Sequence, residues 1–165
     1  MAATYTGRLG DGLVARPVSA DARDDGEVRG HVGGRLTGVA FGFRAEGDRV
    51  RGWVRRGGGP GVPLELAADA EHSLRGRIGG ADAAVRLDEG RVVGVLAGQQ
   101  LFSATWDEGR RALRGEAGPA PVVAAGHGRG ALARGHRPAT PVLLEIGAAG
   151  RPLLGALVLL LGLAP

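Results

Sequence analysis

The chain of 165 residues contains no cysteine and only six aromatic residues. The lack of cysteine excludes disulfides, thiol catalysis and cysteine-ligated zinc or iron–sulfur sites. Lysine is absent as well, so all 21 basic residues are arginine. The 32 glycines do not follow the strict triplet period of collagen. Glycine that recurs between apolar residues favours tight turns and β-structure over a flexible linker.

The net charge of +4 is small and unevenly placed. Residues 1–118 carry 17 arginines against 16 acidic residues, a balance of +1, whereas residues 119–165 carry four arginines against one acid, a balance of +3. Nucleic-acid-binding proteins show a broader basic footprint, so no nucleic-acid partner is expected. The chain does not start with a basic stretch followed by an apolar one, so we expect no signal peptide and a cytoplasmic location.

One short motif, a glycine between apolar residues in a strand-like stretch, recurs six times. Its glycines, at spacings of 23, 22, 24, 18 and 21 residues, are Gly7, Gly30, Gly52, Gly76, Gly94 and Gly115. A period near 20 residues is too short for helical repeats and suits a β-hairpin with two turns. Turns such as Asp88-Glu89-Gly90 join the units. The sequence therefore predicts an all-β antiparallel meander of about 11 to 12 short strands.

The two faces of the glycine strands differ in polarity. In RVRGWVRR, Val50, Gly52 and Val54 share one face, and Arg51, Trp53 and Arg55 lie on the other. One face should therefore pack in the core while the other is solvated, as in an antiparallel sheet. Because a packed interior leaves no empty space, something must approach the backbone at each glycine.

The uncharged stretch Pro152–Ala164 predicts an apolar helix that begins at its proline. These 13 residues would span only about 20 Å as a helix, too short for the ~30 Å core of a bilayer, so a buried core helix is expected. A closed barrel of about a dozen strands has a lumen too wide for its own side chains. We predict that the helix fills this lumen and that the glycines make room for it.

Three segments are predicted along the chain. Residues 1–118 form the hairpin meander, and residues 119–141 form a basic loop rich in proline, glycine and alanine. Residues 142–165 form an apolar C-terminal segment that packs into the β domain or docks from it onto something else. The stretch PVLLEIG, Pro141–Gly147, fits either a last strand or the first turn of a helix.

The order of these elements resembles a known family. It is carried by VRLDEGRVVGVL, SATWDEGRRALRGE and PLLGALVLLLGLA, in which apolar strands flank acidic–glycine turns and an apolar helix follows. This order resembles the tubby-like barrel, the class of the LURP-one-related proteins and the phospholipid scramblases, over nearly the whole chain. The resemblance implies anionic membrane lipid as a ligand. Locally, GDRVRGWVRRG resembles instead the start of a MORN repeat, whose arrays are open hairpin solenoids.

No pattern of catalytic or metal-ligating residues stands out. The histidines are not spaced to share a helix face, and they are His31, His72, His127 and His136. The serines lack a nucleophile elbow, and turns account for most carboxylates. GHGRGALARGH lacks the Gly-Lys-Ser/Thr of a phosphate loop. We therefore predict a non-enzymatic protein without metal or cofactor.

Outward-facing arginines of the glycine strands are the one surface pattern that suggests a ligand. Stacked across a sheet, they would form a stripe suited to phosphate groups, and they are Arg29, Arg51, Arg75 and Arg77. Alternatively, carboxylates on intervening strands neutralise them. Two non-enzymatic functions stay open: a binding or scaffolding domain at an anionic lipid or membrane surface, and a structural subunit docked into an assembly by its apolar tail or sheet edges. An enzyme with a site in the barrel mouth is a third, less favoured alternative. The sequence leaves the oligomeric state open.

Overall fold

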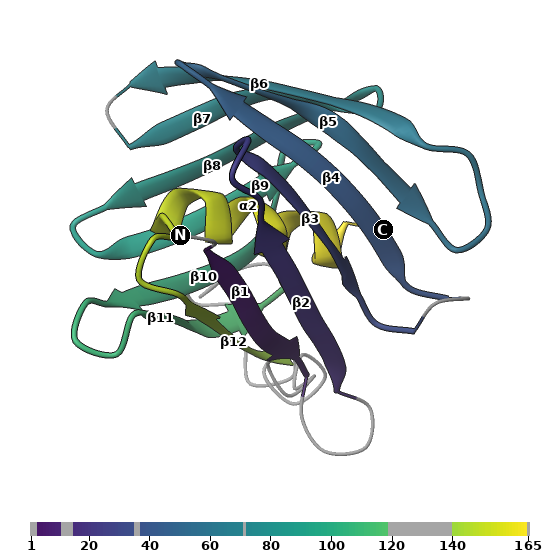
Figure 1. Ribbon diagram of the computed structural model, residues 1–165. Coiled ribbons are helices and arrows are strands. Elements are labelled where there is room, and N and C mark those ends of the chain that lie inside the picture. Colours follow the sequence, from purple (N-terminus) through teal and green to yellow (C-terminus); the bar gives the residue numbers. More distant parts are fainter. Residues whose placement is uncertain (1–2, 11–14, 35–36, 71, 119–139, 165) are drawn as a thin grey trace, which may run out of the picture.

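The computed structural model describes residues 3–10, 15–34, 37–70, 72–118 and 140–164. Within these ranges, twelve antiparallel strands close into a barrel, and a helix follows the last strand (Figure 1). The elements are β1 (Thr4–Leu9), β2 (Arg16–Ala22), β3 (Glu27–Val32), β4 (Val39–Glu46), β5 (Arg49–Arg56), β6 (Val62–Ala70), β7 (Ser73–Ile78), β8 (Ala81–Asp88), β9 (Arg91–Leu96), β10 (Gln99–Asp107), β11 (Ala112–Ala117), β12 (Thr140–Ile146) and α2 (Pro152–Leu163).

Each strand pairs with its neighbours in sequence, and β12 closes the barrel by pairing with β1. The predicted all-β antiparallel meander, its closure and its C-terminal helix are therefore confirmed. The stretch PVLLEIG lies largely in β12, which answers the choice between strand and helix. The predicted loop 119–141 lies outside the described residues except for Thr140 and Pro141, which belong to β12. A closed barrel differs from the open hairpin array of a MORN repeat.

The turns follow the expected chemistry. Glu89 and Gly90 connect β8 to β9, and both have positive φ angles, 49° and 79°. Two consecutive residues with positive φ define the turn whose twist matches that of a two-stranded hairpin. Glycine takes this conformation without a steric penalty, which explains why the acidic–glycine pairs mark strand ends in the sequence.

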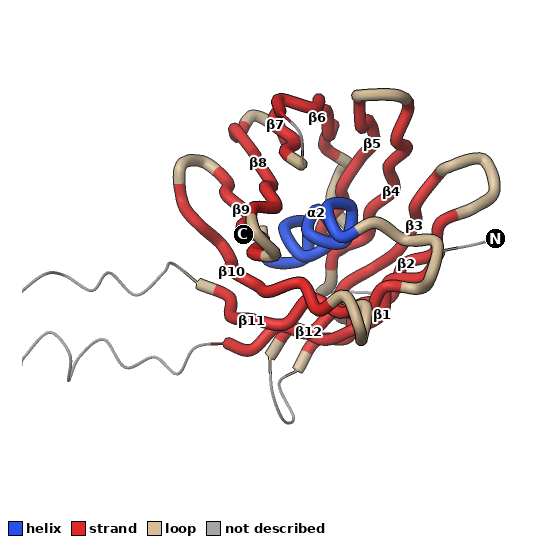
Figure 2. Tube along the Cα trace, turned by 90° about the vertical axis from the view of Figure 1, so that its left-hand side faces the viewer, coloured by secondary structure: helices blue, strands red, loops and turns tan. Residues whose placement is uncertain are grey.

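The helix α2 lies inside the ring of strands (Figure 2). It begins at Pro152, as predicted, and residues Gly155 to Gly162 are buried. Five consecutive side chains in the middle of the helix, from Leu157 to Leu161, have no exposed surface. Burying one such side chain contributes about 1.5–3 kcal/mol. A helix that is apolar on every side is stable only when it is covered completely, and the barrel provides that cover.

The helix does not lie on the barrel axis. It packs mainly against β8, β9, β10 and β11. Large side chains from β4 and β6 belong to the same core, among them Phe41, Phe43, Leu64 and Leu66. The rings of Phe41 and Phe43 stack at 6.1 Å between centroids. Phe41 and Phe43 fill the β4 side of the core, and the helix sits closer to the opposite wall.

The glycines of the wall do not make room for the helix, so this part of the prediction is wrong. A Cβ at Gly52 would lie 2.6 Å from the Cα atom of Phe43 on β4, and one at Gly76 would lie 2.6 Å from the Cα atom of Leu66 on β6. Gly7, Gly30 and Gly115 likewise meet the backbone of a neighbouring strand. Glycine inside a strand allows such a close backbone approach at a tight bend of a barrel.

Polar contacts hold the start of α2 at one mouth of the barrel. Arg111 donates hydrogen bonds from Nη2 to the carbonyl oxygens of Gly147 and Gly150, at 3.2 and 2.7 Å. The backbone N–H of Arg151 donates to the hydroxyl oxygen of Tyr5 at 3.4 Å. The connection between β12 and α2 is therefore tied to β1 and to the β10–β11 turn.

Candidate functional site

The four arginines of the predicted stripe each lie beside a carboxylate. All four side chains are largely exposed. The nitrogen–oxygen distances are 2.6 Å for Arg29–Glu27, 3.4 Å for Arg51–Glu65, 3.8 Å for Arg75–Asp69 and 3.4 Å for Arg77–Asp82. Pairs of this kind contribute at most about 1 kcal/mol to stability, but they reduce the net positive charge that a phosphate group would meet.

The strand register also separates these arginines. Glu65 on β6 is paired with Arg51 on β5 and with Arg77 on β7, so the charges alternate across the three strands. Arg29 lies in a different row, opposite Gly42. The four residues therefore do not form one continuous stripe. A ligand-binding role for them stays a prediction.

The two ends of the barrel differ in charge. At the end where α2 begins, the described turns that join even to odd strands hold more acidic than basic residues: the acids are Asp24, Asp25, Asp48, Glu89 and Glu108, and the arginines are Arg23, Arg110 and Arg111. We call this the acidic end. At the opposite end, the described turns at residues 57–61, 79–80 and 97–98 carry no charged residue. We call this the basic end, because Arg55 and Arg56 directly precede the turn at residues 57–61 and Arg16 lies at the start of β2.

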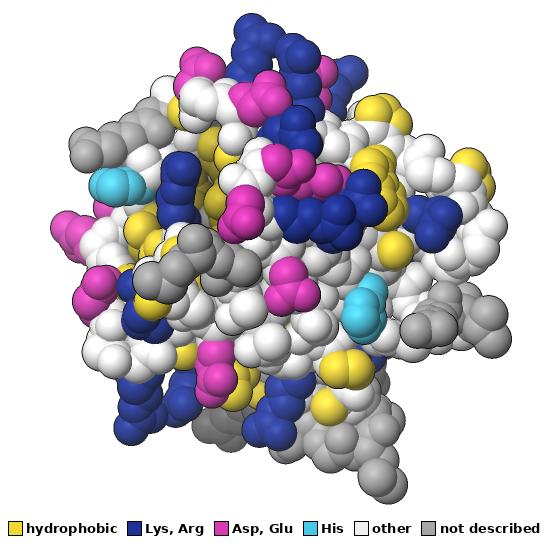
Figure 3. All heavy atoms as spheres, in the orientation of Figure 1, with side chains coloured by type: hydrophobic (Ala, Val, Ile, Leu, Met, Phe, Trp, Pro, Cys, Tyr) yellow, Lys and Arg dark blue, Asp and Glu magenta, His cyan; other side chains and the backbone are white. Residues whose placement is uncertain are grey.

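The space-filling view shows the same asymmetry. In Figure 3 the acidic side chains lie over the left side and the centre, where arginines are mixed with them. The right-hand side, where the β5–β6 turn and the end of α2 lie in Figure 1, shows arginine, hydrophobic and uncharged atoms among the described residues. Acidic and basic side chains are thus mixed at one end of the molecule, whereas the other end shows arginine and apolar side chains without acidic ones in this view.

Two arginines face the mouth of the basic end. Arg16 shares the inward side of β2 with Val18, and Arg56 shares the inward side of β5 with Val54. Arg16 donates a hydrogen bond from Nη2 to the carbonyl oxygen of Gly162 in the last turn of α2, at 3.1 Å. A positive charge at this position favours the C-terminal end of a helix dipole.

The two guanidinium groups repel each other. Burial lowers the pKa of Arg56, and the positive charge of Arg16 lowers it further. No ion pair of Arg16 or Arg56 with a carboxylate is found within the described residues. An anion at this mouth would relieve the repulsion.

The rim beside the mouth combines charge with apolar surface. Arg55 lies over the ring of Trp53, with 5.9 Å from its Cζ atom to the ring centroid, and has no carboxylate partner within the described ranges. Val62, at the start of β6, is 39% exposed, and in the described part of the chain no other large hydrophobic residue is as open to solvent. Near the β5–β6 turn, Arg55 and Trp53 thus lie on the outer face of β5, and Val62 lies on the inward side of β6, opposite Val54.

Sequence reasoning missed the basic end, although a signal for it exists. Alternate turns of a meander lie at the same end of the barrel, so the order of the turns along the chain sorts them into two sets. One set reads DDG, EGD, DEG and DEG, and the other reads GGGPG, GG and AG. The prediction followed the strand faces instead, because the arginines are most regular there.

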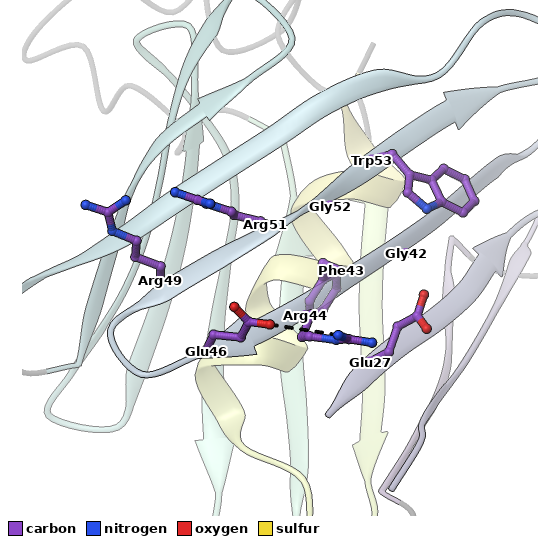
Figure 4. Close-up of a pocket in the computed structure, with 9 residues that line it drawn as sticks. All are labelled: Glu27, Gly42, Phe43, Arg44, Glu46, Arg49, Arg51, Gly52 and Trp53. Atoms are coloured by element: carbon purple, nitrogen blue, oxygen red, sulfur yellow. Dashed lines mark ion pairs between the residues drawn. The ribbon is translucent and has the colours of Figure 1, made fainter. Parts of the chain in front are cut away.

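A second feature is a hollow on the outer face of β3, β4 and β5, with a volume of about 390 Å³ (Figure 4). It is lined by Glu27, Gly42, Phe43, Arg44, Glu46, Arg49, Arg51, Gly52 and Trp53. Of the predicted arginines, it contains Arg51. Because Gly42 and Gly52 have no side chain, the backbone itself forms part of its floor.

The described residues contain no group of three or more His, Asp or Glu side chains that could hold a metal ion. His127, His136 and the stretch GHGRGALARGH lie outside the described residues. No described helix combines the length and the apolar character needed to cross a membrane.

Fold and surface together define a closed antiparallel β-barrel that is filled by its own C-terminal helix and has one acidic and one basic end. Comparison with protein-family models, with curated proteins and with solved structures found no match for the chain.

Proposed function

We propose that the protein is a non-enzymatic binding module whose basic end docks onto a membrane surface that contains anionic lipid. The observation that carries this proposal is the group of three arginines without carboxylate partners within the described residues, Arg16, Arg55 and Arg56, beside the exposed Val62. The resemblance to the tubby-like barrel, which implies an anionic lipid ligand, agrees with it.

Simple electrostatics supports this orientation. An arginine near an anionic leaflet contributes about 1 kcal/mol, and the attraction decays within roughly 10 Å. The basic end would therefore be attracted, while the acidic turns at the other end would be kept away from the surface. Val62, exposed at this end, would add apolar contact at the headgroup level. The protein would act as a peripheral membrane protein.

The alternative, docking into an assembly through the apolar tail or sheet edges, has less support. The tail is α2, which is buried inside the barrel, and every described strand pairs on both sides. Either contact would require the barrel to open.

Vesicle sedimentation tests the proposal. We expect the protein to sediment with vesicles of phosphatidylcholine mixed with phosphatidylserine, and not with phosphatidylcholine alone. The double substitution Arg55→Gln and Arg56→Gln should weaken binding about tenfold or more, since it removes two charges worth about 1 kcal/mol each. Binding should also weaken as salt is raised.

The matched control is the double substitution Arg75→Gln and Arg77→Gln. It removes the same charge from exposed side chains of the predicted stripe, and each of these arginines has its own carboxylate neighbour. We expect it to change binding less than twofold. Equal losses in the two variants would mean that only net charge matters, and a larger loss in the control would move the site to the strand face; both results contradict the proposal.

A further inference from the structure

The hollow on β3, β4 and β5 is lined in part by the backbone of two glycines, Gly42 and Gly52. Gly42 is buried beneath Trp53, and a Cβ there would lie 2.9 Å from the indole Nε1 atom. Gly42 and Trp53 are directly paired across β4 and β5, as are Phe43 and Gly52. The indole therefore lies over Gly42, occupies the space that a larger residue at position 42 would need, and forms one side of the hollow.

Like charges face each other in this hollow. Arg44 on β4 lies directly opposite Arg51 on β5. Two equal charges in directly paired positions destabilise a sheet. Arg49 lies two residues before Arg51 on the same face, and Figure 4 shows both side chains extending to the same side of β5. The hollow therefore gathers three guanidinium groups.

The nearby carboxylates do not engage all the N–H donors of these three arginines. Arg44 has two acidic neighbours, Asp25 at 3.0 Å and Glu46 at 3.8 Å. Arg51 has only the longer contact of 3.4 Å to Glu65, and Arg49 forms no ion pair within the described residues.

Neither Arg49 nor Arg51 donates a side-chain hydrogen bond in the described part of the protein. Glu27 is held by Arg29 at 2.6 Å. Among the lining residues, Arg49 and Arg51 are thus the groups with free hydrogen-bond donors.

From this geometry we infer that the hollow is a binding site for a phosphate monoester, independent of the membrane contact at the basic end. Two planar guanidinium groups with free N–H donors on one strand face suit the oxygens of a phosphate, which accept charge-assisted hydrogen bonds in pairs. The dianion would also offset the repulsion between Arg44 and Arg51. The organic part of the ligand would lie toward Trp53, at the other side of the hollow (Figure 4).

Trp53 provides a direct readout. The chain has two tryptophans, and the substitution Trp106→Phe leaves Trp53 as the only one. In this background, we expect titration with glycerol phosphate to give a saturable change in tryptophan fluorescence. Inorganic phosphate should give a weaker saturable change, and chloride at the same ionic strength none. The double substitution Arg49→Gln and Arg51→Gln should weaken phosphate binding at least tenfold.

The control Arg75→Gln and Arg77→Gln should bind glycerol phosphate within twofold of the parent. A linear response that chloride reproduces, or equal affinity in the Arg49 and Arg51 variant, would overturn the inference. A phosphate monoester can also come from a lipid headgroup, and vesicles that contain phosphatidic acid test this source. If the parent protein binds these vesicles, the Arg49 and Arg51 variant does not, and glycerol phosphate gives no signal with the parent, the ligand is a lipid headgroup. The Arg55 and Arg56 variant should bind glycerol phosphate with the affinity of the parent. The two proposals can therefore fail separately.

Discussion

The ring of Phe102 on β10 lies over Gly94 on β9, so a Cβ at this glycine would come within 2.8 Å of the Cδ1 atom of the ring. The two residues face each other across the strands. In the five other glycine strands, the corresponding space is taken by the backbone or Cβ of the neighbouring strand. At five of the six glycines the neighbouring strand approaches closely, and at Gly94 an aromatic side chain covers the glycine instead. Covering a strand glycine with an aromatic ring also stabilises designed sheets.

The first prediction concerns the glycine whose neighbour is backbone. Gly52→Ala should lower the free energy of unfolding by about 1–3 kcal/mol, because the new Cβ would overlap the backbone of β4, which cannot move without disturbing the sheet. Gly80→Ala is the control, since nothing lies within 4 Å of a Cβ there. Urea unfolding checks both. Equal stability of the two variants would show that β4 and β5 can separate at Gly52 at no cost.

A second prediction addresses the helix. Leu159 has no exposed surface. Leu159→Ala should therefore cost about 2–5 kcal/mol, the usual range for a cavity in a packed core. Val62→Ala, at an exposed site, should change stability by less than about 0.5 kcal/mol. A small loss for Leu159→Ala in chemical denaturation would mean that α2 is not held inside the barrel in solution.

Arg111 gives a third prediction. Arg111→Gln removes the donor to the carbonyl oxygens of Gly147 and Gly150 and should destabilise the protein by about 1–3 kcal/mol. The neighbouring Arg110 has only a long ion pair of 3.9 Å with Asp107. The free energy of unfolding of the Arg110→Gln variant should therefore stay close to that of the parent protein. Proteolysis should report the same order, with faster cleavage between β12 and α2 in the Arg111 variant alone.

Alkaline pH supplies a fourth prediction. Burial raises the pKa of Tyr5, and the hydrogen bond from Arg151 and the nearby arginine charges offset only part of this rise. In the unfolded chain a tyrosine ionises near pH 10. The folded state then holds the proton that the unfolded state releases, so stability is complete below about pH 10 and falls as the pH rises through the folded pKa, by at most about 1.4 kcal/mol per pH unit.

Tyr5→Phe should flatten this part of the pH profile of unfolding. Tyr5 is the only tyrosine of the chain, so its ionisation can be followed directly by ultraviolet absorbance. A titration midpoint at or below the value of free tyrosine would contradict the burial of its hydroxyl.

Much of the fold was predictable because period and composition act locally. The alternation around Gly52 identifies a strand and its inward face, and the uncharged run from Pro152 can be stable only when covered. The partner of Arg51 was not predictable in the same way: Glu65 lies opposite it only because of the register of β5 and β6. The same holds for the space beside Gly52, which depends on how sharply the closed sheet bends.

The candidate site was even harder to predict from the sequence, for a different reason. Arg16 and Arg56 are 40 positions apart in the sequence, and they meet only because both lie at the same mouth of a closed ring. Neither belongs to a motif, and each looks like an ordinary strand end by itself. Charge at the ends of a barrel is a property of the topology, so it follows from the strand order and not from any single stretch of the chain.

Because Gly7 on β1 pairs with Leu144 on β12, β1 cannot complete its pairing until β12 has been synthesised. At the usual rate of synthesis this interval is on the order of ten seconds. During that time the hairpins expose faces that only α2 will cover, because the sequence places the filling of the barrel after its wall. The barrel can close only after β12, which ends at Ile146, has been made, and its core is complete only with α2. Nascent chains interrupted before that point are expected to aggregate or to be degraded.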